Sequence, residues 1–240
     1  MKRRYSSYSD QKSQRHKVRW IVAGVLVFFL AYTSFTSLFF SMRVLENETM
    51  RPNLGPGDRL LFSSYSFYSL IPGIGQENRP ANLRRGSVVL VNMFRGSPPG
   101  MLPRILDGTI RFFTAQNFSL TEQNENVYVK RLIGLPGDEI SMVNYVIRVR
   151  VEGSAFSLTE FEVSEHDYTL EIPQAPALWD SSLPFSGNMD PLILGGDEFF
   201  VISDNRSNTN DSRTWGPVSI SNITGTALFR YWPPSRIGKL

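Results

Sequence analysis

The sequence predicts a mainly β domain that follows a single N-terminal transmembrane helix. Three observations support this fold class. An uncharged run of 23 residues lies near the N-terminus, short apolar or alternating runs recur after it, and turns rich in Gly, Pro and Asp separate those runs. Helical periodicity is weak beyond residue 45, so we expect little helix after the anchor.

The first 19 residues form a basic tail. Seven Lys and Arg side chains stand there against the single acidic residue Asp10, a net charge of +6. The remaining 221 residues hold 18 basic and 21 acidic side chains, so the formal net charge of +3 belongs mainly to the tail. Because the body has no basic stripe, we expect no nucleic-acid partner.

Residues 20–42 form the uncharged run, which as a helix would span about 34 Å, enough to cross a hydrocarbon core of roughly 30 Å. A helix of a globular core is a poor alternative, because only Ser, Thr and Tyr interrupt the apolar residues. A cleaved signal peptide also fits poorly, since its apolar region usually has about 7–15 residues and ends at a small-x-small site. The run therefore predicts an uncleaved anchor in membrane lipid. The positive-inside rule then places residues 1–19 in the cytoplasm and the chain after Arg43 across the membrane.

Residues 43–240 are predicted to form one exported, mostly antiparallel β domain. Strand patterns occur at residues 87–92, 145–152, 199–202 and 227–232. The interval of about 141–196 is predicted to be a β insertion, because its second half is more acidic and less regular. The aromatic segment 63–75 fits two roles equally, packing in the core or touching lipid beside the anchor.

The composition excludes several kinds of catalytic site. The chain has no cysteine and two histidines, so it offers no thiol nucleophile, no thiolate metal site and no multi-histidine metal centre. A Ser-His-Asp triad would depend on His166 alone. Arginine outnumbers lysine by 20 to five, and a guanidinium stays protonated, so it cannot act as a general base. Only Lys130 and Lys239 lie beyond the anchor, and Lys239 is next to the C-terminus.

Three segments carry residues suited to catalysis: TMRPNL at 49–54, YVKRLIGLPGD at 128–138 and SDNRSNTNDSRTWG at 203–216. Each also has a plain structural explanation, as a proline turn, a strand running into a Pro-Gly-Asp turn, and a polar loop held by Asp–Arg pairs. Lys130 lies within the apolar strand pattern of the second segment, and apolar burial lowers the pKa of a lysine. Moving that pKa from about 10.4 to near 7 corresponds to a difference of roughly 4–5 kcal/mol in how the surroundings stabilise the charged and the neutral amine. A neutral Lys130 could deprotonate a hydroxyl nucleophile; the alternative is a buried lysine paired with a carboxylate.

In this order, and after an N-terminal anchor, these segments resemble the boxes of type I signal peptidases (leader peptidases). These are membrane-bound Ser/Lys-dyad proteases that remove signal peptides from exported proteins. Their boxes read approximately S-M-x-P-T-L, R-G-D-x-V-x-F, K-R-x-x-G-x-P-G-D and G-D-N-R-x-x-S-x-D-S-R-x-W-G. The corresponding stretches here are residues 49–54, 85–90, 130–138 and 203–216. The resemblance covers the anchor and most of residues 44–138 and 195–233, and it leaves the insertion unassigned.

The resemblance implies a hydroxyl/lysine dyad, with Thr49 as nucleophile and Lys130 as general base. The supporting residues that it implies are Thr209, whose hydroxyl would orient the lysine, and two ion pairs, Arg131 with Asp204 and Asp211 with Arg213. It further implies a β-rich core with a β-ribbon-like insertion, no metal or organic cofactor, and signal peptides of exported preproteins as partners. Small residues at positions −1 and −3 of those substrates imply shallow apolar pockets. The implied location is the inner or plasma membrane, with a single pass and the catalytic domain on the outer face.

Several departures from the family pattern fall on the site itself. Thr49 stands where the family has serine, and its extra methyl group restricts χ1, although threonine can act as a nucleophile. Glu48 stands where glycine is common, and we expect it to point outward into solvent. Three further replacements are Asn53 for threonine, Thr209 for serine and Ser203 for glycine. The expected oxyanion donors are the backbone N–H of Thr49 and the side chain of Asn47.

Two functions fit these residues. One is a membrane-anchored endopeptidase that removes N-terminal signal peptides; the other is a silent relative that binds exported chains or assists secretion without cutting them. Hydroxyls at Thr49 and Thr209 and the retained Lys130 favour the enzyme. A self-cleaving repressor-type Ser/Lys protease would share the dyad, but it should lack the anchor and carry a DNA-binding domain, and the sequence contains no sign of one.

Overall fold

The computed structural model describes residues 8–64, 83–93, 127–173 and 187–240, and in addition residues 103, 106, 107, 109, 110 and 114. The chain divides into two compact units. The first comprises Met1–Leu38 and Pro99–Leu120, and the second comprises Phe39–Pro98 and Thr121–Leu240. Of the segment 63–75, which we expected either in the core or against lipid, all but Ser63 and Ser64 lie outside the described residues.

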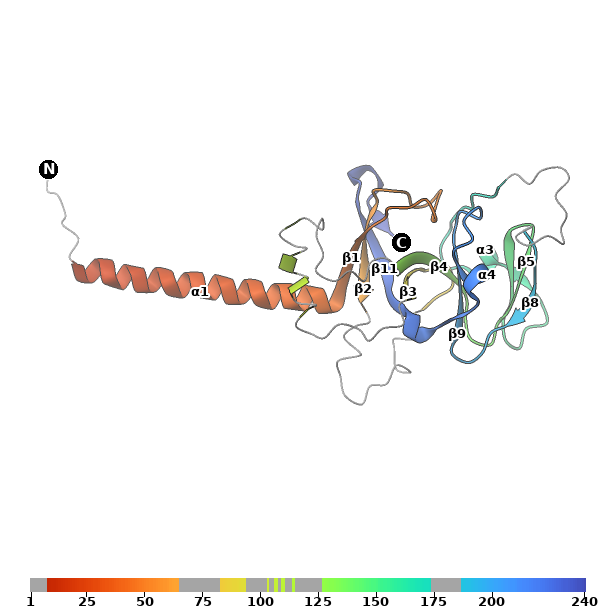
Figure 1. The fold of residues 1–240 in the computed structure, drawn as a ribbon, viewed down its shortest axis with the longest axis horizontal. Coiled ribbons are helices and arrows are strands. Elements are labelled where there is room, and N and C mark those ends of the chain that lie inside the picture. Colours follow the sequence, from red (N-terminus) through yellow and green to blue (C-terminus); the bar gives the residue numbers. More distant parts are fainter. Residues whose placement is uncertain are drawn as a thin grey trace. The chain divides into compact units, whose positions relative to one another are not determined.

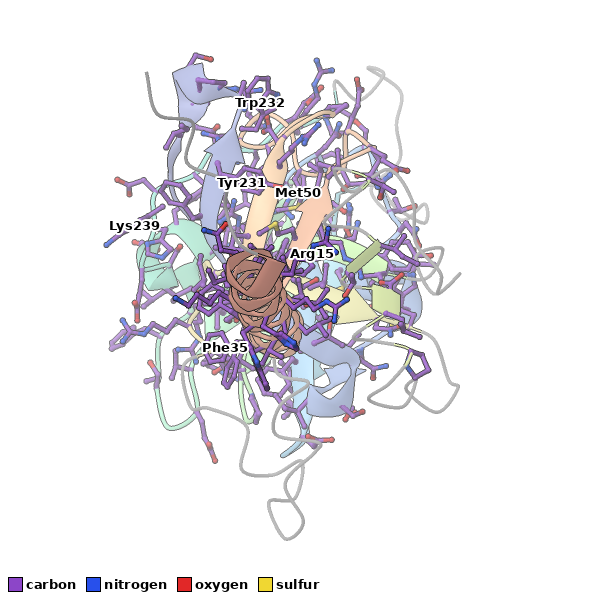
Figure 2. All side chains as sticks on the ribbon, turned by 90° about the vertical axis from the view of Figure 1, so that its left-hand side faces the viewer. Arg15, Phe35, Met50, Tyr231, Trp232 and Lys239 are labelled. Atoms are coloured by element: carbon purple, nitrogen blue, oxygen red, sulfur yellow. The ribbon has the colours of Figure 1, made fainter. Side chains whose placement is uncertain are left out.

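A long helix, α1, spans Tyr8–Phe39 (Figure 1). Its stretch Gln14–Thr33 is long and apolar enough to cross a membrane, and only 6% of its most apolar window is buried within the protein. Figure 2 looks along this helix, with Arg15 and Phe35 labelled on it, and both of these side chains are exposed. The helix also exposes large apolar side chains, among them Trp20, Ile21 and Phe28, as a helix that crosses a membrane does. The helix agrees with the predicted transmembrane anchor.

The helix ends three residues before the predicted end of the anchor at Met42. Its last residue is Phe39, and strand β1 (Phe40–Val44) follows directly. The prediction that the anchor continues to Met42 is therefore wrong for Phe40, Ser41 and Met42. An apolar run looks the same in a helix and in a strand, and here backbone pairing with strand β2 (Arg59–Ser64) decides, because Phe40 lies opposite Ser63.

The main sheet contains eight described strands in the order β1-β2-β11-β3-β4-β9-β10, with β12 also paired to β11. Their remaining bounds are β3 (Val88–Asn92), β4 (Val127–Gly134), β9 (Glu198–Ile202), β10 (Val218–Ser219), β11 (Ile223–Trp232) and β12 (Gly238–Lys239). Every neighbouring pair is antiparallel. Strand β11 is the longest, with ten residues, and it joins β2 to β3 across the sheet.

A second sheet has the order β7-β6-β5-β8. Its strands β5 and β8 are labelled in Figure 1. Its strands and the short helix that follows β7 are β5 (Glu139–Val143), β6 (Val146–Arg150), β7 (Leu158–Thr159), α3 (Glu160–Val163) and β8 (Met189–Ile193). Asn144 and Tyr145 connect β5 to β6, and both have positive φ, as a two-residue hairpin turn of type I′ requires. These elements occupy the interval in which we expected an insertion.

Three apolar clusters hold the second unit together. Strand β3 is buried on both faces, so that Val88 and Leu90 pack into one cluster and Val89 and Val91 into another. Met50, labelled in Figure 2, is fully buried in the first of these clusters. The third cluster joins the second sheet to β4 and β9 through Ile133, Ile140, Ile147, Phe200 and Ile202. The described architecture confirms the predicted fold class, a mainly β domain behind one apolar helix.

Three short helices complete the described part of the second unit: α4 (Ser212–Trp215), η3 (Ile220–Asn222) and η4 (Pro234–Arg236). Helix α4 matters for the site, because Asp211 caps its N-terminus by accepting a hydrogen bond from the N–H of Arg213. The third polar segment, residues 203–216, comprises the loop after β9, helix α4 and Gly216. The described fold thus brings a strand, β4, and this loop together at one end of the main sheet.

Candidate active site

Lys130 lies on β4 and is completely buried. Its neighbour across the sheet is Val89, and its ammonium nitrogen lies 6.0 Å from the ring centre of Tyr128 and 5.8 Å from that of Trp215. Nζ donates a hydrogen bond to the hydroxyl of Ser203 at 2.8 Å. The lysine therefore occupies an aromatic, water-poor position in which one hydroxyl orients it.

Burial lowers the pKa of Lys130 from 10.5 to about 8. Nearby charges have smaller effects on this pKa. The carboxylates of Asp211 and Asp204 raise it, and the guanidinium of Arg213 lowers it. Loss of hydration disfavours the charged ammonium, and the two carboxylates recover only part of that loss. A much larger fraction of the amine is therefore neutral near pH 7 than in an ordinary lysine, which favours its use as a general base.

Thr49 is largely buried in the loop between β1 and β2. Its hydroxyl donates to Oδ1 of Asn47 at 2.8 Å, and its carbonyl accepts from the N–H of Asn205 at 3.0 Å. Asn205 lies two residues after Ser203, so the first and third polar segments meet at the lysine. Among the described residues no hydrogen bond joins Thr49 to Lys130, because each is held by a different partner.

Asn47 presents its oxygen, and not its amide nitrogen, to Thr49. The same Oδ1 accepts from the hydroxyl of Thr49 and, at 3.4 Å, from its backbone N–H. An oxyanion needs N–H donors, and in this arrangement the backbone N–H of Thr49 is engaged with the oxygen of Asn47. The assignment of Asn47 as an oxyanion donor stays a prediction. The side chain of Glu48 behaves as expected, since it points outward and pairs with Arg51 at 3.1 Å, both side chains being about half exposed.

Ser203, and not Thr209, provides the hydroxyl that accepts from Lys130. The register of the sheet explains this difference from our expectation. Arg131 lies opposite Ile202, the last residue of β9, so antiparallel pairing brings the residue that follows the strand, Ser203, beside Lys130. Thr209 lies further along the loop, where its carbonyl accepts from the hydroxyl of Thr214.

Both expected ion pairs are present, and both are buried. Arg131 binds Asp204 with two parallel hydrogen bonds, Nε to Oδ1 at 2.7 Å and Nη2 to Oδ2 at 2.5 Å, and its Nη1 donates to the carbonyl of Gly86. Arg213 binds Asp211 in the same two-point manner, at 2.9 and 2.8 Å. These pairs anchor the loop of residues 203–211 to β4 and to the start of α4.

Asp211 also fixes the backbone of the residue that contacts the lysine. Its Oδ2 accepts the N–H of Ser203 at 2.9 Å. Burial by itself would raise the pKa of Asp211, but hydrogen bonds from Arg213 and Ser203, together with the positive charges of Arg213 and Lys130, outweigh it and lower the pKa. The group therefore stays an anion and holds Ser203 from one side.

The pattern of residues gave no role to several polar side chains near the site. Asn53, noted only as a replacement within a box, donates through Nδ2 to Asp204 at 2.8 Å and to the carbonyl of Thr169 at 2.7 Å. Glu160 and Arg206 form a fully buried ion pair whose partners are 46 positions apart. The position of Arg206 in the D-N-R part of the last box could have suggested a role for it in the site. The sequence around Glu160 gives no indication that this carboxylate is buried.

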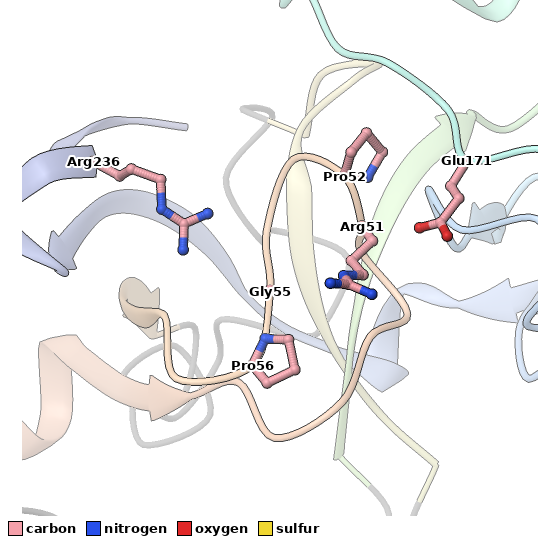
Figure 3. A pocket seen from close by; sticks show the side chains of 6 residues that line it. All are labelled: Arg51, Pro52, Gly55, Pro56, Glu171 and Arg236. Atoms are coloured by element: carbon pink, nitrogen blue, oxygen red, sulfur yellow. The ribbon is translucent and has the colours of Figure 1, made fainter.

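A cavity of about 550 Å³ borders the loop that carries Thr49. It is lined by Arg51, Pro52, Gly55, Pro56, Glu171 and Arg236 (Figure 3). Its two arginines are already paired, Arg51 with Glu48 and Arg236 with Asp58, and the carboxylate of Glu171 accepts from the side chain of Asn205 at 3.3 Å. This polar cavity differs from the shallow apolar pockets that the resemblance implies, and it contains neither Thr49 nor Lys130. In the described part of the chain, no three His, Asp or Glu side chains are grouped as metal ligands would be.

Comparison with known proteins gives a consistent result. Residues 17–232 match a family described as signal peptidase, peptidase S26. The signal peptidase I P of Bacillus subtilis subsp. natto is 25% identical over 95% of this chain and 96% of its own length. A probable signal peptidase I-1 of Synechocystis sp. is 26% identical over 93% of this chain and 82% of its own length. A chloroplastic thylakoidal processing peptidase of Arabidopsis thaliana is 27% identical over 85% of this chain, which spans only 45% of that relative.

Proposed function

Because the chain belongs to the signal peptidase, peptidase S26 family, we propose that it removes signal peptides from exported proteins with Thr49 as nucleophile and Lys130 as general base. The observation that carries this proposal is the state of Lys130. It is fully buried, its pKa is lowered to about 8, and a serine hydroxyl orients it. A lysine with an ordinary pKa would be protonated at neutral pH and unable to accept a proton.

In the proposed reaction, neutral Lys130 takes the proton of the Thr49 hydroxyl while Oγ1 attacks the carbonyl carbon of the scissile bond. The tetrahedral intermediate collapses as the lysine ammonium gives its proton to the leaving amine, which releases the mature protein. The signal peptide remains as an ester on Thr49. Lys130 then deprotonates a water molecule that hydrolyses the ester, and proton return to Thr49 restores the enzyme.

For this reaction the Thr49 hydroxyl has to leave Asn47 and turn toward Lys130. A rotation about χ1 of Thr49 breaks the 2.8 Å hydrogen bond to Asn47 and, once Asn47 moves, releases the N–H of Thr49 as a donor to the oxyanion. Substrate that enters beside Thr49 would compete for these same groups.

We further infer that the basic tail remains in the cytoplasm and that residues 43–240 work on the outer face of the inner or plasma membrane. The charge asymmetry supports this orientation, since residues 1–19 carry a net +6 at the start of the apolar helix. Exported precursors present their cleavage sites at the surface of that membrane, within reach of a domain that starts directly after the helix.

One observation favours the alternative, a relative that binds exported chains without cutting them. The Thr49 hydroxyl is bound to Asn47 and not to Lys130, and Thr49 carries a methyl group that a serine lacks. If the methyl prevents the rotation, the dyad never forms. The effect of Thr49→Ser, which removes that methyl group, on cleavage therefore distinguishes the two functions.

The test is cleavage of an exported precursor by the detergent-solubilised full chain. We expect Thr49→Ala and Lys130→Ala to lose cleavage and Thr49→Ser to keep or raise it. Lys239→Ala is the matched control, because it removes the other lysine of the exported domain, which lies on β12, and should cut like the wild type. Cleavage that survives Lys130→Ala excludes the mechanism. An inert wild type with an active Thr49→Ser variant identifies the silent relative.

A further inference from the structure

The insertion contributes a buried carboxylate that contacts the loop after β9, the loop whose Ser203 binds Lys130. Glu160 lies on α3 and is completely buried. Its carboxylate accepts from three donors: the guanidinium of Arg206, the hydroxyl of Tyr168 at 2.7 Å and the backbone N–H of Ile147 at 2.8 Å. A fully buried carboxylate with this many donors has a defined position.

Arg206 connects this carboxylate to Ser203. Its Nη2 binds Glu160, and its Nη1 donates to the carbonyl of Ser203 at 2.8 Å. The guanidinium is itself completely buried, and its Nε has no hydrogen-bond partner among the described residues. Glu160 is the carboxylate that forms a salt bridge with Arg206. The placement of Arg206 beside Ser203 thus depends on Glu160.

Ser203 is consequently held on both sides by charged groups. Asp211 accepts its N–H at 2.9 Å, Arg206 donates to its carbonyl at 2.8 Å, and its hydroxyl accepts from Nζ of Lys130 at 2.8 Å. Once both backbone groups are fixed, the position of the hydroxyl is largely determined. The position of the lysine nitrogen follows from it.

We propose that Glu160 is a positioning residue for the general base, acting through Arg206 and Ser203 on Lys130. The inference rests on the proposed function, because it assigns the insertion a task in the same reaction. Glu160 acts by geometry and not by its charge, since the charges that shift the pKa of Lys130 are those of Asp211, Arg213 and Asp204. The insertion is then part of the catalytic apparatus through the position that Glu160 gives to Arg206.

The first test measures kcat and KM for Glu160→Gln. We expect kcat to fall about 10- to 100-fold, as displacement of a catalytic group by about 1 Å does, with KM changed by less than about twofold. Glu160→Asp, which keeps the charge on a shorter side chain, should recover part of kcat. Glu165→Gln is the matched control. Glu165 lies in the same segment but its side chain is half exposed and pairs with Arg84, so this variant should have wild-type kcat.

The second test asks whether the loss of kcat in Glu160→Gln depends on the Ser203 hydroxyl. A loss of kcat caused by general destabilisation would not depend on that hydroxyl. In the Ser203→Ala background, Glu160→Gln should lower kcat by less than about threefold further, because no hydroxyl remains to be placed. Additive losses in the double variant overturn the proposal. Wild-type kcat in folded Glu160→Gln overturns it as well.

Folding and the underlying function are checked in the same experiment. If thermal unfolding shows that Glu160→Gln is not folded, Tyr168→Phe takes its place, since it removes one hydrogen bond to Glu160 and keeps the ring that stacks 3.9 Å from Arg131. That variant should lose at least about threefold in kcat, again only when Ser203 is present, and unchanged kcat overturns the proposal. Thr49→Ala and Lys130→Ala are assayed alongside. Cleavage by either one means that the proposed function has failed, and not the role of Glu160.

Discussion

The rate of cleavage should follow the neutral fraction of Lys130 as pH is changed. Burial lowers the pKa of this lysine from 10.5 to about 8. The difference corresponds to roughly 3 kcal/mol of lost preference for the charged form. At pH 7 about one-tenth of the molecules then carry the neutral amine, against about 0.03% for an ordinary lysine, a gain of roughly 300-fold in available base.

The assay is kcat/KM for a precursor peptide between about pH 6 and pH 10. The value should rise about tenfold per pH unit below the pKa and level off above about pH 9. Asp211→Asn provides a second perturbation with a defined direction. In the wild type the negative charge of Asp211 raises the pKa of Lys130, and the positive charge of Arg213, its salt-bridge partner, lowers it. Removing the charge of Asp211 leaves only the effect of Arg213 from this pair, so the pKa of Lys130 should fall below its wild-type value. The rise in activity should therefore move to lower pH in this variant and stay in place in Glu165→Gln.

The free energy of unfolding should also depend on pH through the titration of Lys130, and the direction of that dependence follows from the lowered pKa. A lysine with a lowered pKa binds its proton more weakly in the folded than in the unfolded state, so the folded protein gains stability as pH rises from about 8 toward 10.5. Relative to Lys130→Met, the wild type should gain up to about 3 kcal/mol across that window in urea unfolding. A rate that is independent of pH between about 6 and 9, or a rise that persists in Lys130→Ala, would refute the assignment of the base.

Two predictions concern the framework of the site. Asn53→Ala removes a hydrogen bond to the buried carboxylate of Asp204 and should lower the free energy of unfolding by about 1–3 kcal/mol; an unchanged denaturation midpoint would contradict this. Gly225→Ala should destabilise by at least about 1–3 kcal/mol, because a Cβ there would lie 2.3 Å from the backbone oxygen of Ser63 where β11 pairs with β2. Gly196→Ala is its control, since nothing lies within 4 Å of a Cβ at that glycine; equal thermal shifts in both variants would show that the close approach is unimportant.

Properties that depend on local composition were predictable from the sequence. An uncharged run of 23 residues behind a tail of net charge +6 indicates an anchor whatever the rest of the chain does. Its end was not predictable, because the same apolar letters suit a helix and a strand. Pairing of Phe40 with Ser63, 23 positions later, ends the helix at Phe39.

The lysine proposed as general base could also be selected from the sequence, because few candidates exist. With no cysteine and almost no histidine, the two lysines beyond the apolar helix left only Lys130 in an apolar strand pattern. Two ion pairs expected from the boxes, Arg131 with Asp204 and Asp211 with Arg213, are present in the structure. Oppositely charged groups in adjoining segments of a buried site have few other ways to be satisfied.

The partners of the reactive groups depended on the tertiary structure. The box pattern suggested Thr209 for the lysine, but the antiparallel register of β4 and β9 brings Ser203 to it. The link from Glu160 to Arg206 joins helix α3 to the loop after β9 across 46 positions, and no local pattern records it. Composition and periodicity determine which residues are buried and which can titrate. Strand register and the packing of the insertion decide which buried groups meet, because those distances depend on the whole fold.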